Sequence, residues 1–237
     1  MAGDGGHSSM LDASLERMRA ENQKQVVHCM ICVSRLASGI GDKRDIGAHY
    51  ERLFKACRQK YQGENPSGIL LIYPQHSVHV IEAPWELITA AIADLQNTDR
   101  EGGLLVSSRI LVFVSNVKRL YSQWSYRVLN LPILSKGESY TTSNPVERTV
   151  AASLEMLYKL GTHLARLPQH KLKATLDGLP DQVPQLLIQQ DVLEYLVNCS
   201  SLSTPLEFTQ LYSKPAQVAL DSELVWPLPV RLFPYND

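Results

Sequence analysis

The sequence predicts an α+β fold, with a sheet and two helices in the first half of the chain and mainly helices in the second. Between residues 26 and 132, short β-branched runs and amphipathic stretches follow one another in the order β-α-β-β-α-β-β. This is the split β-α-β pattern of ferredoxin-like folds with one strand added. A long helical periodicity follows in the second half. We therefore expect a tail with a short amphipathic helix over 1–25, the sheet over 26–132, and a helical C-terminal extension with a proline-rich extended tail over 133–237.

The first elements are a short helix, a buried strand and a longer helix. Leu11, Leu15 and Met18 recur at helical spacing between charged residues, which predicts the short amphipathic helix. Residues 26–34 (VVHCMICVS) are almost continuously apolar, as expected of a strand that is buried on both faces. Residues 45–62 place their apolar side chains on one helical face. A helix over that range would complete a first βα unit.

Two strands, a helix and two further strands complete the sheet. Residues 68–73 and 77–81 are apolar runs separated by Pro-Gln-His, which predicts a hairpin. The stretch 84–95 opens with a proline, which suits the first turn of a helix, and continues with an apolar stripe at helical spacing. Residues 109–115 and 125–131 again have the composition of strands.

Helical signals open the extension and prolines close it. Asn144 is a suitable N-cap, with Pro145 as the first helical residue and an apolar face that ends before Pro168. A second helix is expected over 184–197. The stretch 226–235 (WPLPVRLFPY) contains three prolines, which forbid a regular helix and favour an extended or polyproline conformation.

Charge and the length of apolar runs exclude several classes of function. Twenty-three Lys and Arg against 24 Asp and Glu give a formal net charge of -1, so no global field attracts nucleic acid or an anionic membrane. The Lys118–Arg119 pair is expected at a solvated strand end. The apolar runs are far shorter than the roughly 20 residues of a membrane span. Without a signal-peptide pattern, the four cysteines are expected to be reduced thiols of a cytoplasmic protein.

Candidate chemical groups are isolated from one another. Cys29 and Cys32 have CxxC spacing, but residues three apart in a strand point to opposite faces, so core packing is favoured over a metal site or a disulfide. His76 and His79 lack the further ligands that a metal needs. Glu82 is expected to cap the following helix rather than to act in a cleft. We expect no catalytic residues, no metal and no cofactor.

Apolar residues near the two ends of the chain have no evident place in the sheet. They are Leu11, Leu15 and Met18 near the start, and Trp226, Leu228, Leu232, Phe233 and Tyr235 near the end. Such residues must be buried somewhere. Either both ends fold back on the same chain, or they bind a protein partner through a helix or an extended segment. The sequence leaves both alternatives open.

Four segments of the predicted sheet resemble BLUF domains, the blue-light sensors that bind flavin in a ferredoxin-like fold. They are the strand with Val33-Ser34-Arg35, the strand Ser67-Gly68-Ile69-Leu70-Leu71, the hairpin that ends in Val80-Ile81-Glu82, and the approach to the last strand at residues 119–124 (RLYSQW). The resemblance implies a BLUF-type βαββαββ sheet with two helices.

Most flavin-contacting residues of that family are replaced in this chain. The resemblance places Cys32 where the family has its photoactive tyrosine, and His79 where it has its essential glutamine. Tyr61 stands at the asparagine that holds the flavin ring edge, and Tyr126 at the methionine near the last strand, whereas Trp124 matches a tryptophan. Cysteine and histidine cannot reproduce a relay of hydrogen bonds from tyrosine to flavin. The resemblance therefore implies the fold without the photochemistry.

Over its whole length the chain is also similar to the testis-expressed protein 47 family of animals. The similarity is carried by HYERLF at residues 49–54, LLIYP at residues 70–74, and the long C-terminal extension. It implies a degenerate BLUF-like protein of ciliated or flagellated cells, in an axonemal assembly.

Two functions from different classes follow from these observations. The preferred one is a non-enzymatic interaction or scaffold subunit of a ciliary or sperm flagellar assembly, with protein partners docked at its two ends. The alternative is a sensor that binds a flavin or a nucleotide between the two core helices. An acylphosphatase-like enzyme is disfavoured, because a shared fold does not carry function and the basic phosphate loop is missing.

Overall fold

The computed structural model describes residues 10–20, 25–61, 64–98, 103–132 and 145–214. Its elements are, in chain order, α1 (Met10–Ala20), β1 (His28–Leu36), α2 (Arg44–Tyr61), β2 (Ser67–Ile72), β3 (His76–Ala83), α3 (Trp85–Thr98), β4 (Leu105–Val114), β5 (Trp124–Val128), α4 (Val146–Ala165), α5 (Gln169–Asp177), α6 (Leu179–Gln182), the 3-10 helix η1 (Pro184–Leu186), α7 (Gln190–Asn198) and α8 (Pro205–Ser213).

The described strands form one sheet in the order β4-β1-β3-β2-β5. β1 pairs antiparallel with both β3 and β4, and β2 pairs antiparallel with β3. β5 pairs parallel with β2 at the far edge. The first four strands thus have the ferredoxin-like order, and β5 is the added strand. The predicted α+β fold, with a mainly helical extension, is confirmed.

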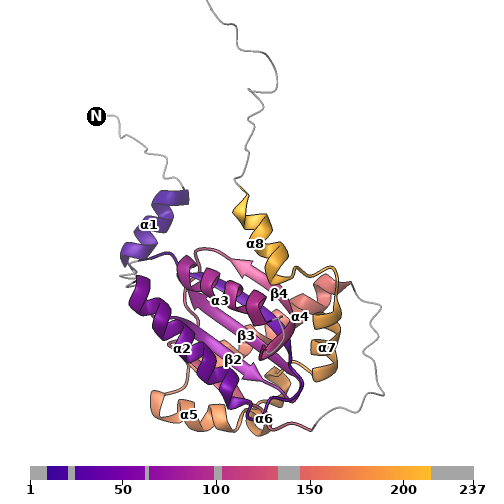
Figure 1. Cartoon of the computed structure of the whole chain (residues 1–237). Coiled ribbons are helices and arrows are strands. Elements are labelled where there is room, and N and C mark those ends of the chain that lie inside the picture. Colours follow the sequence, from indigo (N-terminus) through magenta and orange to yellow (C-terminus); the bar gives the residue numbers. More distant parts are fainter. Residues whose placement is uncertain (1–9, 21–24, 62–63, 99–102, 133–144, 215–237) are drawn as a thin grey trace, which may run out of the picture.

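Helices cover both faces of the sheet (Figure 1). α2 and α3 lie across one face, and the helices of the extension from α4 to α7 cover the other. Along β1, Met30 and Cys32 point into the core under α2 and α3, whereas Ile31 and Val33 point into the opposite core. Successive side chains of a strand alternate between faces, so a strand between two cores is apolar throughout. The continuous apolar run in the sequence predicted this arrangement.

The end of the described chain returns to the face that carries α2 and α3. Near the edge of the sheet, the N–H of Ile110 on β4 donates to the carbonyl of Ser203 at 2.9 Å. α8 then packs on α3 and β4, with Phe208 buried in their core. The side-chain amide of Gln96 on α3 donates to the carbonyl of Pro205 at 2.9 Å. The extension therefore covers part of the edge strand β4, which limits its pairing with other chains.

The helix expected over 184–197 is confirmed from Gln190 onward, but its first part is not α-helical. Pro184–Leu186 form a short 3-10 turn, after which Leu187 adopts an extended backbone with φ -95° and ψ 134°. Leu187 and Ile188 are both buried in the core under the extension, and the extended backbone carries them into it. α7 begins only at Gln190.

Three helices of the extension, α5, α6 and α8, were not predicted from the sequence. A signal for α8 is present in Thr204-Pro205-Leu206-Glu207, a capping box. The hydroxyl of Thr204 accepts from the N–H of Glu207 at 3.2 Å, and the Glu207 carboxylate accepts from the N–H of Thr204 at 2.8 Å. α4 agrees with its prediction, except that Pro145 is the N-cap and Val146 the first helical residue. Asn144, the expected N-cap, lies outside the described residues.

Candidate functional site

Four of the five residues at the predicted flavin positions lie together on the face of the sheet that carries α2 and α3. Cys32 on β1 and His79 on β3 are opposite one another in the strand pairing, and both are buried. The indole N–H of Trp124 on β5 donates to Nε2 of His79 at 2.9 Å. The ring centroids of Trp124 and Tyr126 are 6.1 Å apart. The fifth residue, Tyr61, is the last residue of α2, and its side chain is exposed.

Aromatic rings from α2 fill the space above these strands. The ring of Tyr50 lies edge-on to His79, with centroids 4.5 Å apart, and the ring of Phe54 meets Trp124 at 5.3 Å. Gly47, one turn earlier on α2, lies so close to Tyr126 that a methyl group in its place would overlap the tyrosine ring. Side chains of the chain itself therefore occupy the region where the resemblance places a flavin.

Burial keeps His79 uncharged. Removal from water disfavours the imidazolium and lowers the pKa of His79 to about 3. Because Nε2 accepts the indole proton of Trp124, the neutral ring carries its own proton on Nδ1. That nitrogen is buried and has no hydrogen-bond partner in the described part of the chain.

A polar pair joins α2 to α3 beside this group. Nε2 of His49 lies 2.8 Å from Oδ1 of Asp94, and this hydrogen bond raises the pKa of His49. Burial raises the pKa of Tyr50 well above its ordinary value, and the charge of Asp94 adds to the effect. The Tyr50 hydroxyl is therefore protonated at neutral pH. The pair was not predicted from the sequence, since two residues 45 positions apart on separate helices give no spacing signal.

The residues at this site do not fit a flavin. The relay of the BLUF family needs a tyrosine and a glutamine, and burial here raises the pKa of the Cys32 thiol to about 12, so the thiol stays protonated. The acceptor nitrogen of His79, Nε2, already accepts a hydrogen bond from Trp124. The rings of Tyr50, Phe54 and Tyr126 take up the space between the helices and the sheet.

An acid-stability measurement tests the environment of His79. Its folded pKa of about 3 is lower than the ordinary 6.5, so the unfolded chain binds more protons between these values and stability falls as the pH falls from 6.5 towards 3. The free energy of unfolding should drop by roughly 3 kcal/mol between pH 7 and pH 4 from this group alone. In His79→Gln, urea titrations at the two pH values should lack this part of the loss. An equal loss in both proteins would contradict the buried, neutral histidine.

Glu82 is not a helix cap, contrary to the sequence expectation. As the penultimate residue of β3 it points to the face opposite His79, and its carboxylate is buried. Oε2 accepts from the hydroxyl of Ser67 at 2.7 Å and from the N–H of Tyr121 at 3.2 Å, and Oε1 accepts from the N–H of Leu120 at 2.9 Å. A buried carboxylate needs such donors, and the segment before β5 supplies them. Glu82 therefore fixes that segment to the sheet.

Arg119 belongs to the same network, so its expected place at a solvated strand end is wrong. Its guanidinium donates to the Ser67 hydroxyl at 2.9 Å and to the backbone carbonyl of Glu82 at 2.8 Å. It also pairs with Glu64 at 3.2 Å. Arg119 thus links β2 and β3 to the segment before β5 through hydrogen bonds.

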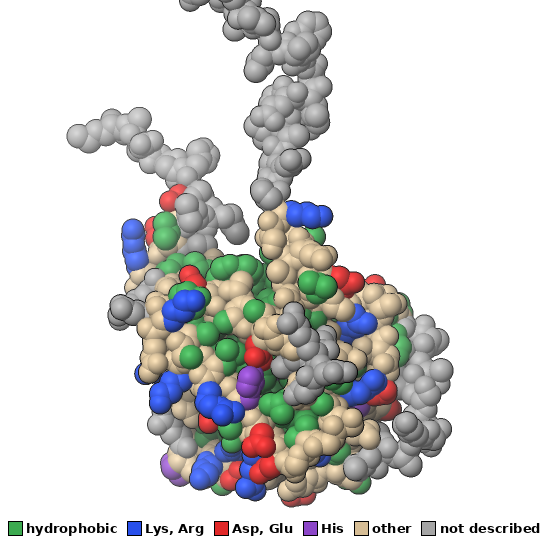
Figure 2. Space-filling model, viewed as in Figure 1, with side chains coloured by type: hydrophobic (Ala, Val, Ile, Leu, Met, Phe, Trp, Pro, Cys, Tyr) green, Lys and Arg blue, Asp and Glu red, His purple; other side chains and the backbone are tan. Residues whose placement is uncertain are grey.

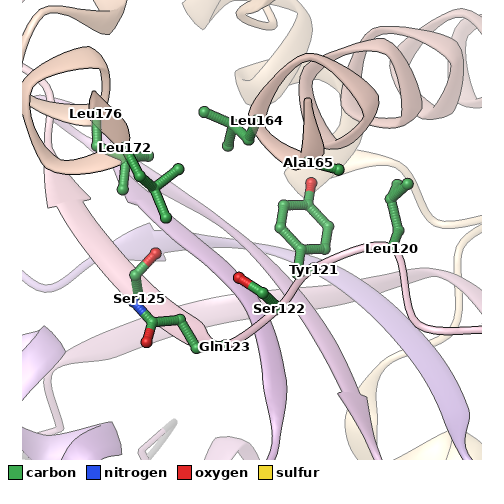
Figure 3. A pocket seen from close by; sticks show the side chains of 9 residues that line it. All are labelled: Leu120, Tyr121, Ser122, Gln123, Ser125, Leu164, Ala165, Leu172 and Leu176. Atoms are coloured by element: carbon green, nitrogen blue, oxygen red, sulfur yellow. The ribbon is translucent and has the colours of Figure 1, made fainter. Parts of the chain in front are cut away.

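A small pocket lies on the face covered by the extension (Figure 3). It is lined by the approach to β5 and by α4 and α5, through Leu120, Tyr121, Ser122, Gln123, Ser125, Leu164, Ala165, Leu172 and Leu176. Its interior has about 20 Å³ of space for water. This is room for little more than one water molecule, so the pocket does not suit a flavin or a nucleotide.

Metal-binding groups, disulfides and membrane-spanning helices are absent from the described ranges. No three His, Cys, Asp or Glu side chains there are grouped so that they could hold a metal ion. All four cysteines are free thiols, and Cys29 and Cys32 pack into opposite cores, as predicted from their spacing. None of the helices within these ranges is both long and apolar enough to cross a bilayer.

Five rings form a cluster where α8 meets α3 and the end of β4. We call it the aromatic surface, and it consists of His28, Trp85, Phe113, Phe208 and Tyr212. The rings of Phe208 and Tyr212 stack with centroids 4.4 Å apart, and Phe113 lies within 5.7 Å of each of the other four rings. Phe208 is buried, but Trp85 is 36% exposed and Tyr212 51% exposed. Figure 2 shows hydrophobic side chains gathered at this end of the molecule, between α1 and α8.

The residues predicted to bind partners are described only in part. α1 is tied to the loop after β4, where the guanidinium of Arg17 donates to the carbonyl of Asn116 at 2.6 Å. Leu15 is exposed and Met18 half-buried, while the side chain of Leu11 lies outside the described set. Trp226, Leu228, Leu232, Phe233 and Tyr235 all lie outside the described residues. Their predicted role stays a prediction.

The order and pairing of the strands define the fold class of the protein. A ferredoxin-like sheet with a fifth strand parallel to β2 is a BLUF-like fold. The chain belongs to the testis-expressed protein 47 family, which matches residues 26–214.

Solved BLUF structures are similar to this chain at low identity. The BLUF domain of BlrP1, a Klebsiella pneumoniae protein, is 16% identical over 44% of this chain and 64% of its own length, with a TM-score of 0.34. BlrB, a BLUF protein in its dark state, is 17% identical over 44% of this chain and 73% of its own, with a TM-score of 0.32. Photo-activated BlsA is 11% identical over 73% and 96%, with a TM-score of 0.34. The chain thus matches less than two thirds of the length of the BlrP1 BLUF chain.

Proposed function

We propose that this protein is a non-enzymatic interaction subunit of a ciliary or sperm flagellar assembly, in which the BLUF-like sheet is a rigid platform. The observation that carries the proposal is the filled space between α2, α3 and the sheet, where Tyr50, Phe54 and Trp124 pack on His79. A platform needs a packed core, whereas a sensor needs a cavity for its ligand. Membership of a testis-expressed family supports the cellular setting.

The partner contact is assigned to the apolar residues at the ends of the chain. Leu15 on α1 is exposed, and α1 stands on the same end of the molecule as α8 (Figure 1). The chain beyond α8 contains Trp226 and Phe233. Tryptophan and phenylalanine are enriched at protein interfaces, and tryptophan often contributes much of the binding energy. The net charge of -1 favours apolar recognition over electrostatic capture of an acidic partner.

A pull-down from flagellated-cell extract tests the proposal. The tagged full chain should recover axonemal proteins, and Trp226→Ser with Phe233→Ser should lose most of them, because truncating an anchor residue costs an interface about 2 kcal/mol or more. Tyr158→Ser is the matched control, since Tyr158 is 65% exposed on α4. Point changes are preferred to a chain ending at Thr204, because that chain lacks α8 and exposes the core around Phe113.

Two outcomes would overturn the proposal. One is that the wild-type chain recovers no axonemal protein. The other is that the purified chain is heat-stabilised by FMN, FAD or a nucleotide, which would support the sensor alternative. Equal recovery by the tail variant would reject the tail as the contact.

A further inference from the structure

The aromatic surface is unusual among the exposed apolar side chains of the described residues. Other large exposed side chains, such as Tyr61 and Tyr158, lie on separate helices outside this ring cluster. Trp85 and Tyr212, by contrast, are partly exposed members of one ring cluster, with centroids 6.2 Å apart. Leu211, the residue before Tyr212 on α8, is 68% exposed. Single exposed apolar residues are ordinary, whereas neighbouring exposed rings in one cluster are typical of a contact surface.

The chain itself supplies a segment that begins at this surface. Tyr212 is the penultimate residue of α8, and residues 215–237 follow directly. The 11 residues from Pro215 to Val225 can span up to about 36 Å when extended, which is ample to bring residue 226 back over the surface. A segment tethered by so short a linker has an effective concentration in the millimolar range. At such a concentration, even a contact with a millimolar dissociation constant is substantially occupied.

The chemistry of the tail matches that of the surface. Trp226, Phe233 and Tyr235 offer rings to Trp85 and Tyr212, and aromatic pairs gain from offset or edge-on contact beyond the area they bury. Three prolines lie between residues 226 and 235, and proline restricts the backbone of a free chain, which lowers the entropy lost on docking.

The charges are complementary as well. Glu86 follows Trp85 on α3 and is close enough to His28 to act on it electrostatically, so it sits at the rim of the aromatic surface. Arg231 is the basic residue within 226–235. An arginine beside Glu86 can also stack on the neighbouring indole.

We propose that residues 226–235 pack against the aromatic surface of the same molecule when no partner is bound. The inference goes beyond the proposed function and does not rest on it, because it concerns the isolated chain. In an assembly, a partner that binds the tail first displaces it from this surface.

Photo-crosslinking of the purified full chain tests the inference. Benzoylphenylalanine in place of Phe233 is irradiated in dilute solution, and the products are digested and analysed by mass spectrometry. We expect links at monomer mass to peptides that contain Trp85 or Tyr212. Tyr212→Ser should lower their yield about five-fold, as expected for loss of an interface anchor, and Tyr158→Ser should leave the yield unchanged.

A charge exchange keeps the test independent of the fold. Arg231→Glu lies in the tail, cannot unfold the sheet, and should lower the yield, and adding Glu86→Lys should restore it. Links at dimer mass would overturn the inference in favour of a second copy. Links that avoid both peptides, or a yield indifferent to Tyr212→Ser, would overturn it outright. A failed pull-down alongside the expected links would reject only the proposed function.

Discussion

Replacing Gly68 with alanine is expected to lower the free energy of unfolding by about 4 kcal/mol, through left-handed backbone strain and overpacking together. Gly68 lies on β2, between β3 and β5, and has φ of +132°. A methyl group there would overlap the backbone carbonyl oxygen of Val80 on β3. Because the obstacle is backbone within a sheet, it cannot rotate away as a side chain could.

Gly41→Ala is the matched control for this change. A methyl group at Gly41 would meet no heavy atom within 4 Å beyond its chain neighbours, and Gly41 has no positive φ. Its substitution should therefore change stability by less than about 0.5 kcal/mol. Urea denaturation of the three proteins, followed by circular dichroism, gives the comparison. Equal stability of Gly68→Ala and wild type would contradict the close approach of β2 to β3.

Glu82→Gln is expected to cost about 3 kcal/mol of unfolding free energy, because charge-assisted bonds are lost and a buried donor is left unpaired. Both carboxylate oxygens accept hydrogen bonds, from Leu120 on one side and from Ser67 and Tyr121 on the other. Whichever way the glutamine amide is turned, its NH₂ group faces a backbone N–H that is also a donor. The segment from residue 119 to β5 should loosen first.

The control for Glu82→Gln is Glu51→Gln, which removes a carboxylate from the exposed side of α2. It should leave stability within about 0.5 kcal/mol of wild type. Amide hydrogen exchange distinguishes a local effect from a global one, and faster exchange at Leu120 and Tyr121 is expected in Glu82→Gln. Unchanged exchange at these two amides would show that the carboxylate does not hold them.

The candidate site could be predicted from the sequence only as a set of substitutions. The resemblance placed Cys32, His79, Trp124 and Tyr126 at former flavin positions, and the structure brings these four together. It did not indicate what fills the space, since Tyr50 and Phe54 were visible only as residues on an apolar helical face. The close contact between Gly47 and the ring of Tyr126 depends on how α2 packs against β5. No local sequence pattern encodes this packing.

The extension was harder to predict than the sheet. α4 has a long apolar face and was recognised, whereas α5 and α6 are short and follow Pro168 and Gly178. The one local signal for α8 is its capping box. Short helices have weak periodicity, and most of their stability comes from tertiary packing rather than from intrinsic propensity.

Local sequence was enough to establish the order of strands and helices between residues 26 and 132 and the burial of β1 on both faces, and the family resemblance added the replacement of the flavin-contacting residues. The first two features follow from periodicity and residue identity, which are local properties. The folded chain was needed to join Trp124 to His79, 45 positions away, and Glu82 to the N–H of Leu120, 38 positions away. It was also needed for α8 to complete an aromatic surface with α3 and β4. Such contacts depend on strand register and on how helices dock, and both are set by the packing of the whole chain.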